Sequence, residues 1–234
     1  MRRETQRSQS SPPVIAMRAP GTGPFVVVGM VLCLLVSMSL LRNVLWSDPI
    51  TLWEDVVRKS PNAARAYNNL GLAYKAVNRH HDAIAMFSRA LERDPFYVYA
   101  YNNRGVEQGK SGQTDRALED FASAITLRPD YVDAYNNRGV EQGKLGLIDR
   151  ALEDFTQAIT LDPSNVNAYY NRGKVFAETM QPERALEDFT MAITLNPAHA
   201  DAYHGRGLAF EKMGQLDRAT EDYKRSEQLL SLKR

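Results

Sequence analysis

Three short motifs in this chain contain residue types that bind phosphate, metal or nucleotide, but each has the wrong spacing. The GKS at 109–111 resembles the end of a phosphate-binding loop, yet that loop needs another glycine at position 104, where arginine stands. His80 and His81 are adjacent, so on a helix they point in different directions and do not form one metal site. The GRG at 205–207 lacks the third glycine of a dinucleotide site. The sequence therefore predicts no catalytic residue, no metal site and no cofactor.

An arginine and an aspartate sixteen residues apart recur in four segments and predict ion pairs. An earlier segment with the same spacing has Leu70 and Met86 instead, so the two positions change character together. We expect each arginine to bond its aspartate, because a partly buried guanidinium needs an acceptor. A row of arginines that binds an acidic ligand is the alternative. The four pairs are Arg104 with Asp120, Arg138 with Asp154, Arg172 with Asp188, and Arg206 with Asp222.

The elements that position these residues come from a repeat of 34 residues. Each recurrent tyrosine is followed after four residues by glycine, after sixteen by alanine and after twenty by an aromatic residue. This pattern predicts two amphipathic helices per unit, with small residues at the close approach, aromatic residues in the contact and proline after the second helix. We expect Asn78, Gly112, Gly146 and Gly214 in the turns between the helices. The recurrent tyrosines are Tyr67, Tyr101, Tyr135, Tyr169 and Tyr203.

This period and pattern resemble the tetratricopeptide repeat (TPR). The resemblance implies an all-α fold, a right-handed solenoid of antiparallel helix pairs. The segment at 47–63 imitates the second helix of a unit, so we expect a half-repeat linking helix there before the TPR domain at 64–234. The expected units are 64–97, 98–131, 132–165, 166–199 and 200–233.

Asparagines recur on the first helix of each unit and suggest a binding surface. In the TPR family the first helices form a concave wall, and the residue two positions after the tyrosine faces the groove. Here that residue is Asn69, Asn103, Asn137 or Asn171. An amide donates and accepts hydrogen bonds, so such a row can hold the backbone of an extended peptide, and a similar row is associated with the repeats of O-linked N-acetylglucosamine transferase.

The residue before each of these asparagines is expected on the same face. The alternative interpretation is that the asparagines cap or bridge neighbouring repeats, and the sequence leaves both open. The residues concerned are Asn68, Asn102, Asn136, Tyr170 and His204.

An apolar segment precedes the repeats. Residues 25–41 carry no charge over seventeen positions, which is just long enough to span a bilayer as a helix. We therefore expect a disordered basic tail at 1–24 and a single transmembrane helix at 25–46. A cleaved signal peptide is the alternative, since Ser37 and Ser39 offer a small-x-small cleavage pattern. The basic tail favours a cytoplasmic N-terminus, which places the repeats in the periplasm or lumen.

Charge and composition restrict the partners. The net charge is +1, and no basic region outside the tail indicates nucleic acid. The sequence predicts a membrane-anchored, non-enzymatic scaffold that binds a protein or an extended peptide in the TPR groove. The segment at 42–71 also resembles the junction between the last membrane helix and the repeats of transmembrane O-mannosyltransferase-like TPR proteins. That resemblance implies an alternative, an accessory or truncated part of a membrane O-glycosyltransferase system that presents polypeptide acceptors.

Overall fold

The computed structural model describes residues 23–232, without the side chains of residues 23–25 and 40–45. Within this range every regular element is a helix, as the repeat period predicts. The chain divides into two compact units, residues 1–48 and 49–234, which are described separately. Most of the basic tail expected at 1–24 lies outside the described residues, so its disorder stays a prediction.

The first unit contains one described helix, α1 (Gly23–Trp46), which includes the apolar segment. Its large apolar side chains between Val26 and Met38 are 50–61% exposed. Across the described residues, no helix has both the length and the apolar character required to cross a membrane. Because the side chains of residues 40–45 are not described, the transmembrane helix expected at 25–46 stays a prediction.

The second unit begins with α2 (Pro49–Lys59), which packs against the first full helix pair. Trp53 and Val57 lie against a core that includes Tyr74 and Phe87, and the Tyr74 hydroxyl donates a 2.7 Å hydrogen bond to Glu54. Burial together with this bond to a carboxylate raises the pKa of Tyr74 to about 12. The α2 helix therefore covers the apolar side of the first pair, as a preceding repeat would.

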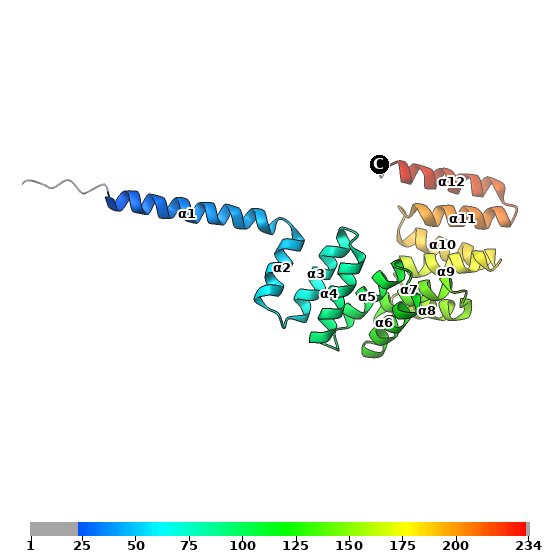
Figure 1. Cartoon of the computed structure of the whole chain (residues 1–234). Coiled ribbons are helices and arrows are strands. Elements are labelled where there is room, and N and C mark those ends of the chain that lie inside the picture. Colours follow the sequence, from blue (N-terminus) through cyan, green and yellow to red (C-terminus); the bar gives the residue numbers. More distant parts are fainter. Residues whose placement is uncertain (1–22, 233–234) are drawn as a thin grey trace, which may run out of the picture. The chain divides into compact units, whose positions relative to one another are not determined.

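Five helix pairs follow, and each helix packs against its neighbours in chain order (Figure 1). The second helix of each of the first four pairs ends two residues before a proline, because the proline ring excludes helical geometry at the preceding residue. The pairs are α3 (Ala64–Ala76) with α4 (His80–Arg93), α5 (Val98–Lys110) with α6 (Thr114–Leu127), α7 (Val132–Lys144) with α8 (Ile148–Leu161), α9 (Val166–Glu178) with α10 (Pro182–Leu195), and α11 (Ala200–Lys212) with α12 (Leu216–Ser231).

The core of each pair is a contact between glycine on the first helix and an aromatic ring on the second. A Cβ atom added to Gly71 would lie 2.6 Å from the Phe87 ring, so only glycine fits there. The first four pairs use phenylalanine, each ring being 0–1% exposed, and the fifth uses Tyr223 against Gly207. These contacts follow the 34-residue spacing, which confirms the packing expected from the sequence.

The turns inside four of the pairs contain the residues that the sequence predicts. Gly112, Gly146 and Gly214 have φ of +75°, +73° and +75°, and Asn78 has φ of 58°. In the fourth pair the same position is Met180, with φ of 58°. A left-handed backbone is unfavourable for a side chain such as methionine, so this turn carries local strain that the other four avoid.

Candidate functional site

The asparagine rows connect successive repeats. Asn103 Nδ2 donates to Asn68 Oδ1 over 3.0 Å, and the same bond joins Asn137 to Asn102 and Asn171 to Asn136. The bridging considered as the alternative is therefore present between the first helices of repeats one to four.

This bridging limits what the rows offer a ligand. Asn68 and Asn102 are 4% and 6% exposed, while the asparagines that donate the bridges are half-buried. In the fifth repeat the row stops at Gly205, because a Cβ there would lie 2.7 Å from the Phe189 ring. The rows act first as connections along the array, and their peptide-binding role stays a prediction.

The predicted arginine–aspartate pairs are present in all four repeats. Arg138 donates through Nε and Nη2 to the two carboxylate oxygens of Asp154, over 2.7 and 2.8 Å. The hydrogen bonds that Arg138 donates to Asp154 raise the pKa of Arg138. Arg172 also donates to the Thr156 hydroxyl of the preceding repeat, over 3.1 Å. Because these guanidinium groups are already paired, a row of free arginines for an acidic ligand is not what the geometry provides.

Two buried glutamates fill the spaces between the first helices of repeats one to three. Glu107 is fully buried and bonds His80 Nδ1 at 2.5 Å and Lys110 Nζ at 3.0 Å. Burial raises the pKa of Glu107, but the hydrogen bonds from His80 and Lys110 outweigh it, so the pKa is lowered overall. Glu141 occupies the same position one repeat later, where its carboxylate covers Gly109 and bonds Lys144 at 2.6 Å.

The next junction, between repeats three and four, is open. Val175 stands where Glu107 and Glu141 stand, and a Cβ atom added to Gly143 would meet nothing within 4 Å. A cavity of about 200 Å³ results, which we call the Gly143 cavity. Its walls are Val140, Phe155, Asn171 and Val175, with Lys144, Lys174 and Glu178 at the rim.

A second cavity of about 240 Å³ follows at the junction of repeats four and five, and we call it the Tyr170 cavity. It shares Lys174 and Glu178 with the Gly143 cavity. Tyr170 and His204 stand at positions where earlier repeats have asparagine, and both line this cavity. Neither an amide bridge nor a glutamate fills the junction. Its lining includes Tyr170, Ala177, Phe189, Asp201, His204 and Leu208.

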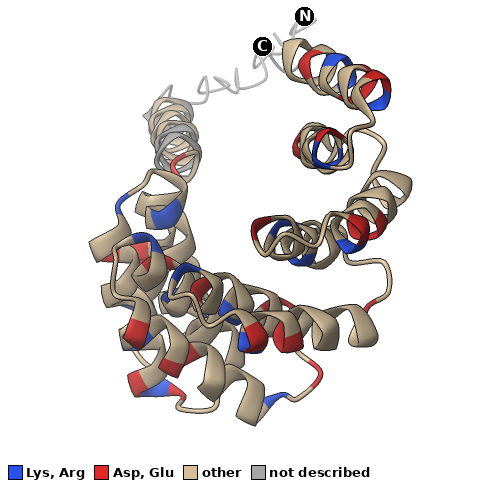
Figure 2. Ribbon diagram, turned by 90° about the vertical axis from the view of Figure 1, so that its right-hand side faces the viewer, with Lys and Arg blue, Asp and Glu red and all other residues tan. Residues whose placement is uncertain are grey.

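Charged side chains of both signs are mixed along the helices of the second unit. Figure 2 shows Lys and Arg interspersed with Asp and Glu on the helices of the second unit. Within residues 23–232, no group of His, Cys, Asp and Glu side chains is arranged to hold a metal ion.

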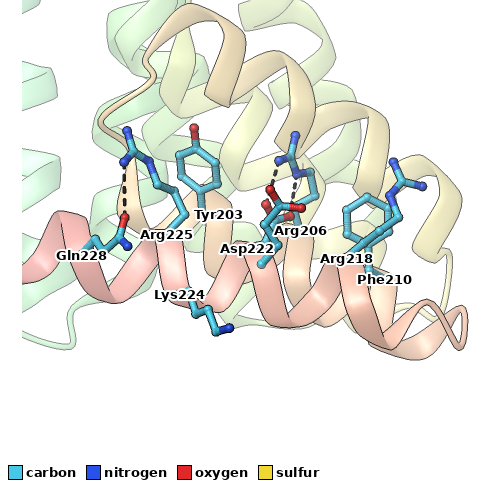
Figure 3. A pocket seen from close by; sticks show the side chains of 9 residues that line it. Tyr203, Arg206, Phe210, Arg218, Asp222, Lys224, Arg225 and Gln228 are labelled. Atoms are coloured by element: carbon cyan, nitrogen blue, oxygen red, sulfur yellow. Dashed lines mark hydrogen bonds and ion pairs between the residues drawn. The ribbon is translucent and has the colours of Figure 1, made fainter.

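A larger cavity of about 550 Å³ lies between α11 and α12 and has many charged groups (Figure 3). Arg206 bonds Asp222, Arg218 stacks on Phe210 with 4.1 Å between the guanidinium carbon and the ring centroid, and Arg225 bonds a glutamine. Lys224 points away from the other labelled side chains (Figure 3). Because these three arginines are engaged within the protein, this cavity offers few free groups to a ligand. The two cavities between the first helices are therefore the candidate site.

Protein-family profiles match segments throughout the array of helix pairs. A profile described as tetratricopeptide repeat matches residues 64–97, 132–165 and 166–199. Two further profiles with the same description match residues 86–119 and 200–229, so that the matches together cover more than half of the chain. The chain is a tetratricopeptide repeat protein. Comparison with curated proteins found no match.

Solved TPR structures share this fold. A crystal structure of MamA is 24% identical, with a TM-score of 0.62 over 70% of this chain and 96% of MamA. YrrB, described as a TPR protein with an unusual peptide-binding site, is 22% identical, with a TM-score of 0.58 over 76% of this chain and 91% of YrrB. TTC0263, a thermophilic TPR protein of Thermus thermophilus, is 22% identical, with a TM-score of 0.62 over 71% of this chain and 91% of that chain. At these identities the likeness concerns the fold.

The TPR cavities were not predicted as such from the sequence. Of the nine predicted site residues, Asn171 lines the Gly143 cavity, and Tyr170 and His204 line the Tyr170 cavity. The other six lie in the asparagine rows of the first three repeats. The available signal was the change from glutamate to Val175 at the same position of successive TPR units.

Proposed function

We propose that this protein is a scaffold that binds an extended peptide segment of another protein along the face formed by the first helices of its TPR units. The observation that carries the proposal is the pair of adjoining cavities between α7, α9 and α11. Apolar walls with a few polar groups are typical of ligand-binding pockets. Asn137 on α7 and Asn171 on α9 are half-buried, and their Oδ1 atoms pair with backbone N–H groups of the peptide while their Nδ2 atoms donate the bridges.

Site-specific cross-linking tests this function on the full chain. A photoreactive amino acid replaces Leu208, which lines the Tyr170 cavity, and the variant is incubated with a diverse pool of unstructured peptides. The matched control carries the same amino acid at Met191, which is 40% exposed on α10. We expect peptide cross-links from position 208 and few from position 191. No peptide cross-linked from position 208, or equal yields from both positions, would contradict the proposal.

We further propose that residues 25–46 anchor this scaffold in a membrane as a single pass, with the repeats on the periplasmic or lumenal side. The proposal is supported by the uncharged residues 25–41 and by the helical conformation of that segment. Alkaline extraction of membranes from expressing cells should leave the full chain in the pellet. Release into the supernatant would oppose an anchor, and a mature N-terminus beyond Ser39 would identify a cleaved signal peptide instead.

A further inference from the structure

The Gly143 cavity and its counterpart one repeat earlier share one wall and differ in the adjacent helix, where Val175 takes the place of Glu141. Residues 101–110 and 135–144 have the same sequence, YNNRGVEQGK, so Gly109 and Gly143 occupy equivalent positions. The carboxylate of Glu141 covers Gly109, whereas Val175 is too short to cover Gly143. The array therefore contains one filled and one open version of the same glycine site.

The open version has the walls and size of an apolar side-chain pocket. Val140, Phe155 and Val175 form its apolar part, and Val175 also packs with Ile148 beside it. An apolar protein cavity of about 150 Å³ accepts a benzene molecule. At about 200 Å³, the Gly143 cavity accommodates one branched or aromatic side chain.

The rim charges favour a particular neighbour for that side chain. Lys144, Lys174 and Glu178 stand at the rim, where Lys174 is the lysine left to bond an acidic group of a ligand. Lys144 already pairs with Glu141, whereas within residues 23–232 neither Lys174 nor Glu178 forms an ion pair. The Tyr170 cavity adds Asp201 to the shared rim, which shifts its balance toward negative charge.

We propose that the two cavities are adjacent subsites for two apolar side chains of one extended peptide, with an acidic residue beside the side chain that enters the Gly143 cavity. This inference rests on the proposed peptide-binding function and specifies the sequence class that the site selects. Lys174 bonds the acidic residue from the shared rim. Repeats one to three contribute no such subsite, because Glu107 and Glu141 occupy the corresponding spaces.

Filling the cavity tests the first subsite. Gly143→Leu places an apolar side chain in the open space, and the absence of any atom within 4 Å of the added Cβ favours folding of the variant. Full-length Gly143→Leu should bind the best peptide of the pool at least tenfold more weakly than wild type, at unchanged or higher thermal stability. Gln157→Leu, an exposed change on α8, is the matched control and should keep wild-type affinity.

Charge reversal tests the rim. In a positional peptide library, Lys174→Glu should replace the preference for an acidic residue beside the first apolar position with a preference for a basic one. Lys224→Glu, the same change on α12 at a residue that lines neither the Gly143 cavity nor the Tyr170 cavity, should leave the preference unchanged (Figure 3).

The outcomes separate the two proposals. Wild-type affinity in Gly143→Leu, with peptide still cross-linked from position 208, would overturn the subsite and leave the scaffold function in place. If the Lys174→Glu variant keeps the wild-type preference for an acidic residue, the proposed role of Lys174 at the rim is overturned. Failure of wild type to bind any peptide would overturn both proposals.

Discussion

Replacing Asp154 with methionine should destabilise the array measurably, because it leaves the Arg138 guanidinium without its acceptor. Asp154 is 5% exposed and accepts two hydrogen bonds from Arg138, whose side chain is 24% exposed. Hydrogen bonds to charged groups contribute about 1.5–3 kcal/mol each. Because Arg138 regains some water at its exposed edge, we expect a net loss of about 2 kcal/mol rather than the full sum of two bonds.

The first repeat supplies the compensating change. There Leu70 and Met86 occupy the two positions and pack in one apolar cluster. The double variant Arg138→Leu with Asp154→Met should therefore recover much of the stability lost by Asp154→Met alone. Urea unfolding followed by circular dichroism gives the free energies of the four members of this cycle.

Two results would refute this reasoning. If Asp154→Met unfolds with the same urea midpoint as wild type, the ion pair contributes nothing to stability. A double variant less stable than Asp154→Met by the full effect of Arg138→Leu would mean that the two positions act independently.

Three further predictions concern single positions. Met180→Gly should stabilise the protein by about 1 kcal/mol, measured as a higher urea midpoint, because glycine relieves the φ of 58° and the lost side chain is 72% exposed. Gln142→Phe should also stabilise the protein, by about 1–2 kcal/mol, because the buried Gln142 Oε1 has no hydrogen-bond partner among the described residues and the equivalent Phe176 supports a stacked arginine. An unchanged or lower urea midpoint would oppose this. The lowered pKa of Glu107 means that the folded protein binds fewer protons there than the unfolded chain, so its stabilising effect is present above the ordinary value of 4.5 and is lost as pH falls through the folded pKa. Glu107→Gln should therefore lose less stability than wild type between about pH 5 and about pH 3, and equal acid sensitivity of the two proteins would contradict this.

The sequence alone was sufficient for the repeated framework. The 34-residue period places Gly71 beside Phe87 because helix geometry and a constant turn bring the same two positions together in every unit. The joint change of Arg and Asp positions was enough to predict the ion pairs, since an arginine in the interior requires a partner. The turn glycines were predictable for the same local reason, whereas Met180 was not, because its side chain gives no sign of a left-handed backbone.

The tertiary structure decided what the asparagines and the junctions do. Two adjacent asparagines point in directions about 100° apart on a helix, and only the packing of neighbouring first helices determines that one bridges to the other across the repeats. The cavities depend on a side chain from the next repeat, where Val175 leaves Gly143 uncovered while Glu141 covers Gly109. Space between two helices is set by residues on both, so the pattern within one unit reveals the fold and the arrangement of successive units reveals the site.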